Sequence, residues 1–197
     1  KKTGYVFRSQ SDTEVLLAAV EVWGLNIALD KFIGMFAFAL WDKDNRELYL
    51  VRDRVGEKPL YYGLFGNVIL FGSELKALEV HDSFVKSINR DAISLLLRYN
   101  YIPAPYSIYD NIYKIKPGTF LAIKIEKQKI STTEHTYWSF ENAVKSGGSD
   151  NKIFSYEEAK FGIKDALTES VRSQMIADVP LGAFLSGGID SSLIVSI

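Results

Sequence analysis

The chain carries near its C-terminal end the run Leu185-Ser186-Gly187-Gly188-Ile189-Asp190-Ser191-Ser192. The apolar residues 179–185 lead into this run and predict a short strand, and the residues from Ile189 onward predict a helix. A strand, a glycine turn and a helix in this order open a parallel α/β nucleotide-binding domain. We therefore expect residues 155–197 to contain the first βα unit of such a domain.

The same run has the chemistry of a phosphate site. Its two glycines let the backbone approach an anion closely, and the free N–H groups at a helix start favour negative charge. The serines add hydroxyl donors, whereas the Asp190 carboxylate would repel a phosphate unless Mg²⁺ lay between them. No lysine follows the glycines, which disfavours a P-loop kinase. The alternative is a glycine turn with serine caps, but the apolar strand before it favours Mg²⁺-bound phosphates.

The composition is that of a folded protein without a charge bias. Of the 197 residues 47% are hydrophobic, and 23 Lys and Arg balance 24 Asp and Glu. The sequence shows no basic stripe for nucleic acid, no apolar run of the roughly 18 residues that a membrane span needs, and no secretory signal. We therefore expect a cytoplasmic protein. The chain begins without Met and stops inside an apolar stretch, so we expect it to be truncated at both ends.

Cysteine is absent, and histidine occurs only as His81 and His135. Disulfides, thiolate metal sites and a cysteine nucleophile are therefore excluded within this chain. Both histidines lie among polar residues. We interpret them as solvated loop residues rather than as metal ligands or members of a Ser-His-Asp triad.

Residues 1–145 predict an α+β domain with an antiparallel sheet covered by helices. Ser11 or Asp12 caps a helix over residues 13–23, which Gly24 closes, and a second short helix follows. Four strands joined by short turns are expected in one largely antiparallel sheet. Their residues are 34–41, 46–52, 60–64 and 68–71. The helices over residues 13–23 and 73–78 would cover this sheet.

Further along, Asn89 caps a predicted helix that Pro103 and Pro105 end, and residues 119–130 predict a strand and hairpin. Residues 146–154 are rich in Gly, Ser and Asp and predict a linker between domains over 1–145 and 155–197. Ser155 and Glu158 have the spacing of a capping box, which predicts a helix to about Met175. The expected buried stripe of this helix is Ala159, Ile163, Ala166, Leu167 and Val171.

Residues 178–192 resemble the pyrophosphate loop of the asparagine synthetase family, whose second domain is adenine-nucleotide hydrolase-like. The resemblance implies that this loop holds the β- and γ-phosphates of ATP while a substrate carboxylate attacks the α-phosphate. Ammonia then displaces AMP from the acyl-adenylate. It also implies that Leu185 contacts the adenosine part through its backbone and that Asp190 positions Mg²⁺. The implied pyrophosphate-binding residues are Ser186, Gly187, Gly188, Asp190, Ser191 and Ser192.

The upstream part resembles the later portion of a class II glutamine amidotransferase domain, which is an N-terminal-nucleophile hydrolase. The resemblance is carried by Ser11-Asp12-Thr13-Glu14, Gly34-Met35-Phe36-Ala37-Phe38-Ala39, Arg52-Asp53-Arg54-Val55-Gly56-Glu57-Lys58-Pro59-Leu60-Tyr61-Tyr62, and Phe71-Gly72-Ser73-Glu74-Leu75-Lys76. It implies that Asp12 binds the α-amino group of glutamine. The alternative is a plain N-cap, and the two roles coexist only if one carboxylate oxygen stays free.

The other charged residues of these segments are interpreted as structural. The charges of residues 52–54 and Lys58 would pin the turn between two strands through ion pairs and hydrogen bonds. Glu74 is interpreted as a helix-start carboxylate, with a functional role as the alternative. The aromatic residues between positions 32 and 41 are interpreted as core packing rather than as a cofactor site.

The resemblance implies a reaction in which aspartate, ATP and glutamine give asparagine, AMP, pyrophosphate and glutamate. The acceptor pocket is expected beyond Ile197, so another carboxylate acceptor, such as a surface-polysaccharide uronic acid or a β-lactam precursor, is the first alternative. A non-catalytic binding or assembly protein is the second. The family uses an N-terminal cysteine that is absent here, so we expect this chain alone to be inactive. The candidate assembly is a homodimer.

Overall fold

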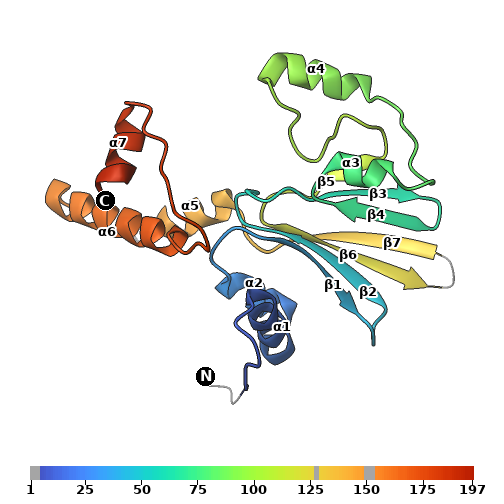
Figure 1. The fold of residues 1–197 in the computed structure, drawn as a ribbon, viewed down its shortest axis with the longest axis horizontal. Helices are drawn as coiled ribbons and strands as arrows, with labels where there is room; N and C mark the ends of the chain where they lie inside the picture. Colours follow the sequence, from blue (N-terminus) through green and yellow to red (C-terminus); the bar gives the residue numbers. More distant parts are fainter. Residues whose placement is uncertain (1–4, 127–128, 149–153) are drawn as a thin grey trace. The chain divides into compact units, whose positions relative to one another are not determined.

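The computed structural model describes residues 5–126, 129–148 and 154–197 of the chain. They divide into two compact units, Lys1–Val144 and Lys145–Ile197. The first unit contains two antiparallel sheets with helices packed against them (Figure 1). The described part of the second unit contains helices and connecting segments without a strand.

The larger sheet of the first unit has four strands in the order β1-β2-β6-β7. Its strands are β1 (Ala37–Asp42), β2 (Glu47–Arg52), β6 (Thr119–Glu126) and β7 (Lys129–Thr136), and every neighbouring pair is antiparallel. The predicted strands over residues 46–52 and the hairpin after residue 119 are confirmed.

The expectation of one sheet containing the first four strands is wrong. Strands β3 (Tyr61–Phe65) and β4 (Val68–Gly72) form a separate three-stranded sheet with β5 (Ile112–Lys114), in the order β4-β3-β5. A strand has only two edges, and those of β2 are occupied by β1 and by β6, which comes from far along the sequence. No edge of β2 therefore remains for β3.

The central strands β2 and β6 of the larger sheet are buried on both faces, as the alternation of their side chains shows. Leu50, Leu121 and Ile123 point to one face, where they pack with Leu60 and Ile115 and with the partly buried Tyr62 and Ile69 of the smaller sheet. Val51, Phe120 and Ala122 point to the other face and pack against Leu29 of a helix. The first unit is thus layered as helices, sheet and second sheet (Figure 1).

The helix layer consists of α1 (Asp12–Trp23) and α2 (Leu25–Lys31). Gly24 ends α1 with a φ of 76°, a conformation that glycine adopts without a Cβ clash, and its N–H donates to the Val20 carbonyl oxygen. Ala28 and Leu29 of α2 are fully buried. The two predicted helices and the glycine between them are confirmed.

A dense set of hydrogen bonds fixes the turn between β2 and β3. Asp53 is fully buried, and its two carboxylate oxygens accept the backbone N–H groups of Glu57 and Lys58, each at 2.9 Å. The Arg52 guanidinium donates to the carbonyl oxygens of Gly56, Lys58 and Ile115 at 2.6, 2.8 and 2.7 Å. The structural interpretation is confirmed for Arg52 and Asp53, whose side chains bond to backbone groups of the turn. The expected ion pairs of this turn and the expected role of the Lys58 charge stay predictions.

The smaller sheet is covered by α3 (Leu75–Glu79), whose Leu78 packs with Tyr109 and Ile112. Helix α4 (Arg90–Tyr99) begins at the predicted cap, where the Asn89 side chain accepts the Ala92 N–H at 2.9 Å. It ends at Asn100, whose left-handed φ of 59° stops the helix before the prolines that were expected to end it.

The predicted linker begins too early. Helix α5 (Phe140–Gly148) continues through residues 146–148, which were placed in the linker. These small residues extend a helix that Ser139 starts, since its hydroxyl oxygen accepts the Asn142 N–H at 3.2 Å. Residues 149–153 of the linker lie outside the described part of the chain.

In the second unit, α6 (Tyr156–Gln174) starts with the predicted capping box between Ser155 and Glu158 and ends where expected. Two other expectations are wrong. Residues 179–185 form no strand, and none of the residues of α6 is buried, including the stripe headed by Ala159. A strand needs a hydrogen-bonding neighbour and an apolar stripe needs a covering layer. The described residues of this unit supply neither, so Phe184 is 100% exposed.

The buried carboxylate of Asp53 yields the first prediction. Replacing it by Asn should lower the free energy of unfolding by roughly 2–3 kcal/mol, because the amide NH₂ would face one of the two backbone N–H donors. Urea unfolding followed by tryptophan fluorescence measures this change. The matched control is Asp44→Asn, at an exposed carboxylate in the β1–β2 turn, which should change stability by less than about 0.5 kcal/mol. Equal effects of the two substitutions would contradict the anchoring role of Asp53.

Candidate functional site

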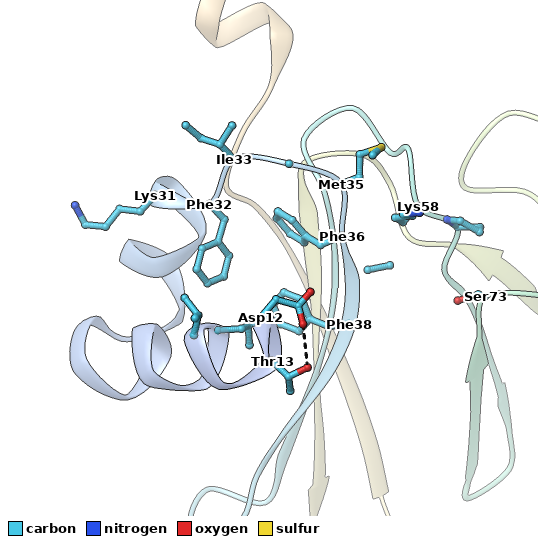
Figure 2. Close-up of a pocket in the computed structure, with 15 residues that line it drawn as sticks. Asp12, Thr13, Lys31, Phe32, Ile33, Met35, Phe36, Phe38, Lys58 and Ser73 are labelled. Atoms are coloured by element: carbon cyan, nitrogen blue, oxygen red, sulfur yellow. Dashed lines mark hydrogen bonds between the residues drawn. The ribbon is translucent and has the colours of Figure 1, made fainter. Parts of the chain in front are cut away.

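A cavity of about 640 Å³ opens in the first unit between the start of α1 and the turn that leads into β3. Its walls come from the first turn of α1, from the segment between α2 and β1, and from Lys58, Pro59 and Ser73 (Figure 2). Aromatic rings form much of one wall. Phe32 and Phe36 meet edge to face with their ring centroids 5.8 Å apart, and Phe36 and Phe38 lie equally close.

These rings serve two purposes. They pack against the buried cluster around Val51 and Phe120, which confirms their interpretation as core residues. They also line the cavity, a role that the sequence pattern did not indicate. Ile33 and Met35 beside them are 84% and 48% exposed, so the cavity has an open apolar rim.

Asp12 is the acidic residue of this cavity. It is the first residue of α1, but the helix is capped by Ser11, whose hydroxyl oxygen accepts the Thr13 N–H at 3.2 Å. Among the residues that the structure describes, the Asp12 carboxylate accepts one hydrogen bond, a long one of 3.4 Å from the Thr13 hydroxyl (Figure 2). The plain N-cap alternative is therefore wrong. Because the cap is made by its neighbour, Asp12 lines the cavity with a carboxylate that does not serve as the cap of α1.

Two lysines border the same cavity in different ways. The Lys31 ammonium lies 5.2 Å from the ring centroid of Trp23, so its charge faces an aromatic ring of α1. Lys58 is held by its backbone, since its N–H donates to Asp53 and its carbonyl oxygen accepts from Arg52. The charge of Lys58 was expected to pin the turn, whereas both of these bonds are made by its backbone. Its place in the cavity wall depends on how the turn folds back toward α1.

Glu74 does not line the cavity, although the neighbouring Ser73 does. Glu74 precedes α3 at the N-cap position without a side-chain capping bond, and its carboxylate pairs with Lys76 at 2.7 Å on the surface. Its interpretation as a helix-start carboxylate is confirmed. Exposed pairs of this kind contribute little to stability.

Glu14 is a residue whose importance sequence reasoning missed. Its carboxylate accepts the backbone N–H groups of Arg8 and Ser9 at 2.8 and 2.7 Å and the Ser9 hydroxyl at 2.5 Å. It thereby ties the segment before α1 to the first turn of the helix. The available signal was the spacing Ser11-x-x-Glu14, which equals the capping-box spacing recognised at Ser155 and Glu158.

The glycine-rich run forms a tight turn at the start of α7 (Ile189–Ser196) in the second unit. Gly187 has a φ of 79°, and a Cβ there would meet nothing within 4 Å, so the glycine is required by conformation rather than by space. Gly188 is the N-cap, and its carbonyl oxygen accepts the Ser192 N–H at 3.0 Å. The predicted glycine turn followed by a helix is thus present without the expected strand.

The donors of this turn converge at the helix start. The Ser186 and Ser191 hydroxyl oxygens are 3.0 Å apart, and the Ser191 hydroxyl donates to the Gly188 carbonyl oxygen at 3.1 Å. The N–H groups of the first turn of a helix have no intrahelical acceptor. Hydroxyls and free N–H groups at one point suit phosphate oxygens, so the residues present fit a pyrophosphate group.

Asp190 lies exposed in the first turn of α7. No group of three or more His, Cys, Asp or Glu side chains that could hold a metal ion occurs among the described residues. A Mg²⁺ ion at Asp190 would therefore take most of its oxygen ligands from phosphate and water, which is how Mg²⁺ usually binds beside nucleotides.

None of the helices in the described ranges is both long and apolar enough for a membrane span.

Acidification should release the segment before α1. The hydrogen bond from the Ser9 hydroxyl, and then that from the Arg8 N–H, hold the pKa of Glu14 below its ordinary value of 4.5. A depressed pKa in the folded state means that the bonds stabilise the fold above the unfolded pKa and are lost as pH falls through the folded pKa. We expect the Arg8 and Ser9 amide signals in NMR spectra to titrate with an apparent pKa below 4.5. The titration should vanish in Glu14→Gln, and a midpoint at or above 4.5 in the wild type would contradict the bonding.

Comparison with known proteins covers both units. Residues 1–138 match the model of the glutamine amidotransferase domain family, and residues 162–197 match the asparagine synthase family. The asparagine synthetase [glutamine-hydrolyzing] 1 of Bacillus subtilis is 37% identical over 98% of this chain and 29% of its own length. The putative asparagine synthetase [glutamine-hydrolyzing] 2 of Methanocaldococcus jannaschii is 38% identical over 95% of this chain and 35% of its own length.

A more distant relative, amidase chry2 of Gibberella zeae, is 30% identical over 98% of this chain and 27% of its own length. The chain thus spans between 27% and 35% of the length of these three relatives. Among solved structures, the glutamine phosphoribosylpyrophosphate amidotransferase of B. subtilis, complexed with ADP and GMP, superposes with a TM-score of 0.45. It shares 19% identity over 70% of this chain and 25% of its own. On these matches the chain belongs to the glutamine amidotransferase domain family, and its last residues, 162–197, are similar to the asparagine synthase family.

Proposed function

We propose that the protein to which this chain belongs is a glutamine-dependent asparagine synthetase. In the proposed reaction, ATP adenylates the side-chain carboxylate of aspartate with release of pyrophosphate, and ammonia from glutamine displaces AMP. The first unit would bind glutamine in a domain of the N-terminal-nucleophile hydrolase type. The second unit would belong to a parallel α/β domain that binds ATP. We place the domains at residues 1–145 and 155–197.

The observation that carries the proposal is the carboxylate of Asp12, which lines the cavity of the first unit and does not cap α1. An amino-acid ligand presents an ammonium group, and a carboxylate that is free of capping duty is its natural partner. The cavity volume of about 640 Å³ lies in the range that small-molecule sites occupy. We therefore assign Asp12 to the α-ammonium group of glutamine.

The turn at residues 186–192 supports the ATP-dependent half of the proposal. When bound, Mg²⁺ would neutralise charge between the phosphates and the Asp190 carboxylate. Ser186, Ser191 and Ser192 and the N–H groups at the start of α7 would hold the pyrophosphate, and the Leu185 backbone would contact the adenosine part. Without a lysine beside the glycines, this turn suits release of pyrophosphate better than transfer of the terminal phosphoryl group.

The nucleophile for glutamine hydrolysis is not supplied by these 197 residues, because they contain no cysteine. We therefore propose the complete activity for the intact enzyme and expect none from this chain alone. What this chain contributes to the amidotransferase reaction is recognition of glutamine. Binding is accordingly the property that tests its part of the proposal.

The test of the glutamine site compares two ligands. Glutamine and 4-carbamoylbutanoate differ only in the α-ammonium group, so the ratio of their dissociation constants isolates the contribution of that group. We expect the chain to prefer glutamine, and Asp12→Asn to lower the preference about tenfold, which corresponds to about 1.4 kcal/mol for one charge-assisted contact. NMR titration of the 197-residue chain measures both constants, including those in the millimolar range.

The control is Asp91→Asn, which removes an exposed carboxylate from the first turn of α4 in the same unit. This variant changes the net charge by the same amount and should keep the wild-type preference. A wild-type chain that bound both ligands equally would overturn the assignment of Asp12. An unchanged preference in Asp12→Asn would do the same.

A different acceptor is the second candidate function, because no residue of this chain is assigned to the acceptor. It retains glutamine and ATP and replaces aspartate by another carboxylate. An assay of pyrophosphate release by the intact enzyme distinguishes the two. We expect release that depends on aspartate and saturates with it. Release with a uronic acid but none with aspartate would exclude asparagine synthesis and leave the glutamine and ATP sites in place.

A further inference from the structure

The start of α1 is held by hydrogen bonds among the residues on both sides of Asp12, and these bonds do not involve the Asp12 carboxylate. Glu14 accepts three hydrogen bonds from Arg8 and Ser9. The Ser9 hydroxyl oxygen in turn accepts the Ser11 N–H at 3.2 Å, and the Ser11 hydroxyl oxygen accepts the Thr13 N–H at 3.2 Å. The residues on both sides of Asp12 are therefore bonded to one another.

Helix α6 shows what the same sequence spacing does elsewhere in the chain. There, Glu158 folds back on its own cap and accepts the Ser155 N–H at 2.8 Å and the Ser155 hydroxyl at 2.7 Å. In α1, Glu14 reaches past the cap to residues 8 and 9, and the N–H of the cap Ser11 is bonded by the Ser9 hydroxyl oxygen instead. The arrangement in α1 thus extends the ordinary capping box toward the N-terminus, to the residues two and three positions before the cap.

The extended arrangement gives the backbone N–H groups of Arg8 and Ser9 an acceptor within the chain. Without the Glu14 carboxylate, the exposed N–H groups of Arg8 and Ser9 become available to water and to other nearby acceptors. The Ser9 hydroxyl then loses the bond that orients it toward Ser11. Asp12 is the nearest other carboxylate in the sequence, and Asp side chains at helix starts readily bond to such N–H groups. A carboxylate drawn into capping has less capacity for a ligand.

We propose that Glu14 is a positioning residue for Asp12: it occupies the donors of residues 8 and 9 so that the Asp12 carboxylate faces the cavity and binds an ammonium group there. The inference rests on the proposed binding of glutamine at Asp12. It assigns to Glu14 a role in ligand selectivity through its neighbour, with no contact of its own to the ligand.

The test is Glu14→Gln, which keeps the size of the side chain. Its amide oxygen can accept from one side only, and its NH₂ group would oppose a backbone N–H donor. We expect the preference for glutamine over 4-carbamoylbutanoate to fall three- to tenfold, because Asp12 is diverted from the ammonium group. Affinity for 4-carbamoylbutanoate should stay within about twofold of the wild type, since that ligand has no ammonium group to lose.

The matched control is Glu158→Gln, which breaks the ordinary capping box of α6. It should leave both dissociation constants unchanged. A merely structural role for Glu14 would weaken the two ligands equally and leave their ratio at the wild-type value. That result would overturn the inference, because the ratio is the quantity that depends on the ammonium contact.

The double variant Asp12→Asn/Glu14→Gln completes the experiment. If Glu14 acts through Asp12, adding Glu14→Gln to Asp12→Asn changes the ratio no further, whereas independent residues would lower it in two separate steps. A loss of preference in Asp12→Asn but not in Glu14→Gln would overturn the role of Glu14 and leave the glutamine site standing. A wild-type chain without any preference would overturn both.

Discussion

The buried carboxylate of Asp53 is the constraint on which the first unit depends. A fully buried carboxylate without partners would be strongly destabilising, so the backbone must deliver donors to it. Glu57 and Lys58 do so, and this requirement closes the turn that separates the two sheets. The backbone of Asp53 extends the same node, since its N–H donates to Phe36 and its carbonyl oxygen accepts from Gly56 and Gly118.

This node connects the core to the cavity. Phe36 and Lys58 are both bonded to Asp53, and both line the cavity in which Asp12 lies. Displacing the turn would therefore move one cavity wall as well as the sheet junction. The opposite wall, at the start of α1, has its own local anchor in Glu14. Two carboxylates that accept backbone N–H groups, Asp53 and Glu14, thus fix two walls of the cavity. Asp12 lines the same cavity, and its carboxylate does not have this anchoring role.

What could be predicted from the sequence was mainly local. The caps at Asn89 and Ser155 and the turn at Gly24 depend on residues within one turn of a helix, and each was found where the pattern placed it. The partition of the strands into two sheets depends on β6 taking the free edge of β2, a pairing between distant residues that no local pattern records. The prediction of a strand at residues 179–185 was wrong for a related reason, because a strand forms only beside a hydrogen-bonding neighbour strand, which the described residues of the second unit do not supply.

The same division explains what could be predicted of the site. Asp12 was recognised from a resemblance, but its freedom from capping depends on which of two adjacent residues the helix uses as its cap, and the side chains of both were suitable. We attribute the use of Ser11 rather than Asp12 as the cap to the hydrogen bonds of Ser9 and Glu14. The glycine turn at residue 187 needs no such support, because its left-handed φ and the helix after it are local properties. The turn forms even without the predicted strand, so its presence shows only that the local sequence favours this backbone conformation. The Asp12 carboxylate does not cap α1, because Ser11 does so within the bonds that Ser9 and Glu14 make. Its position depends on these neighbours, and for that reason it is the stronger indication of a binding function.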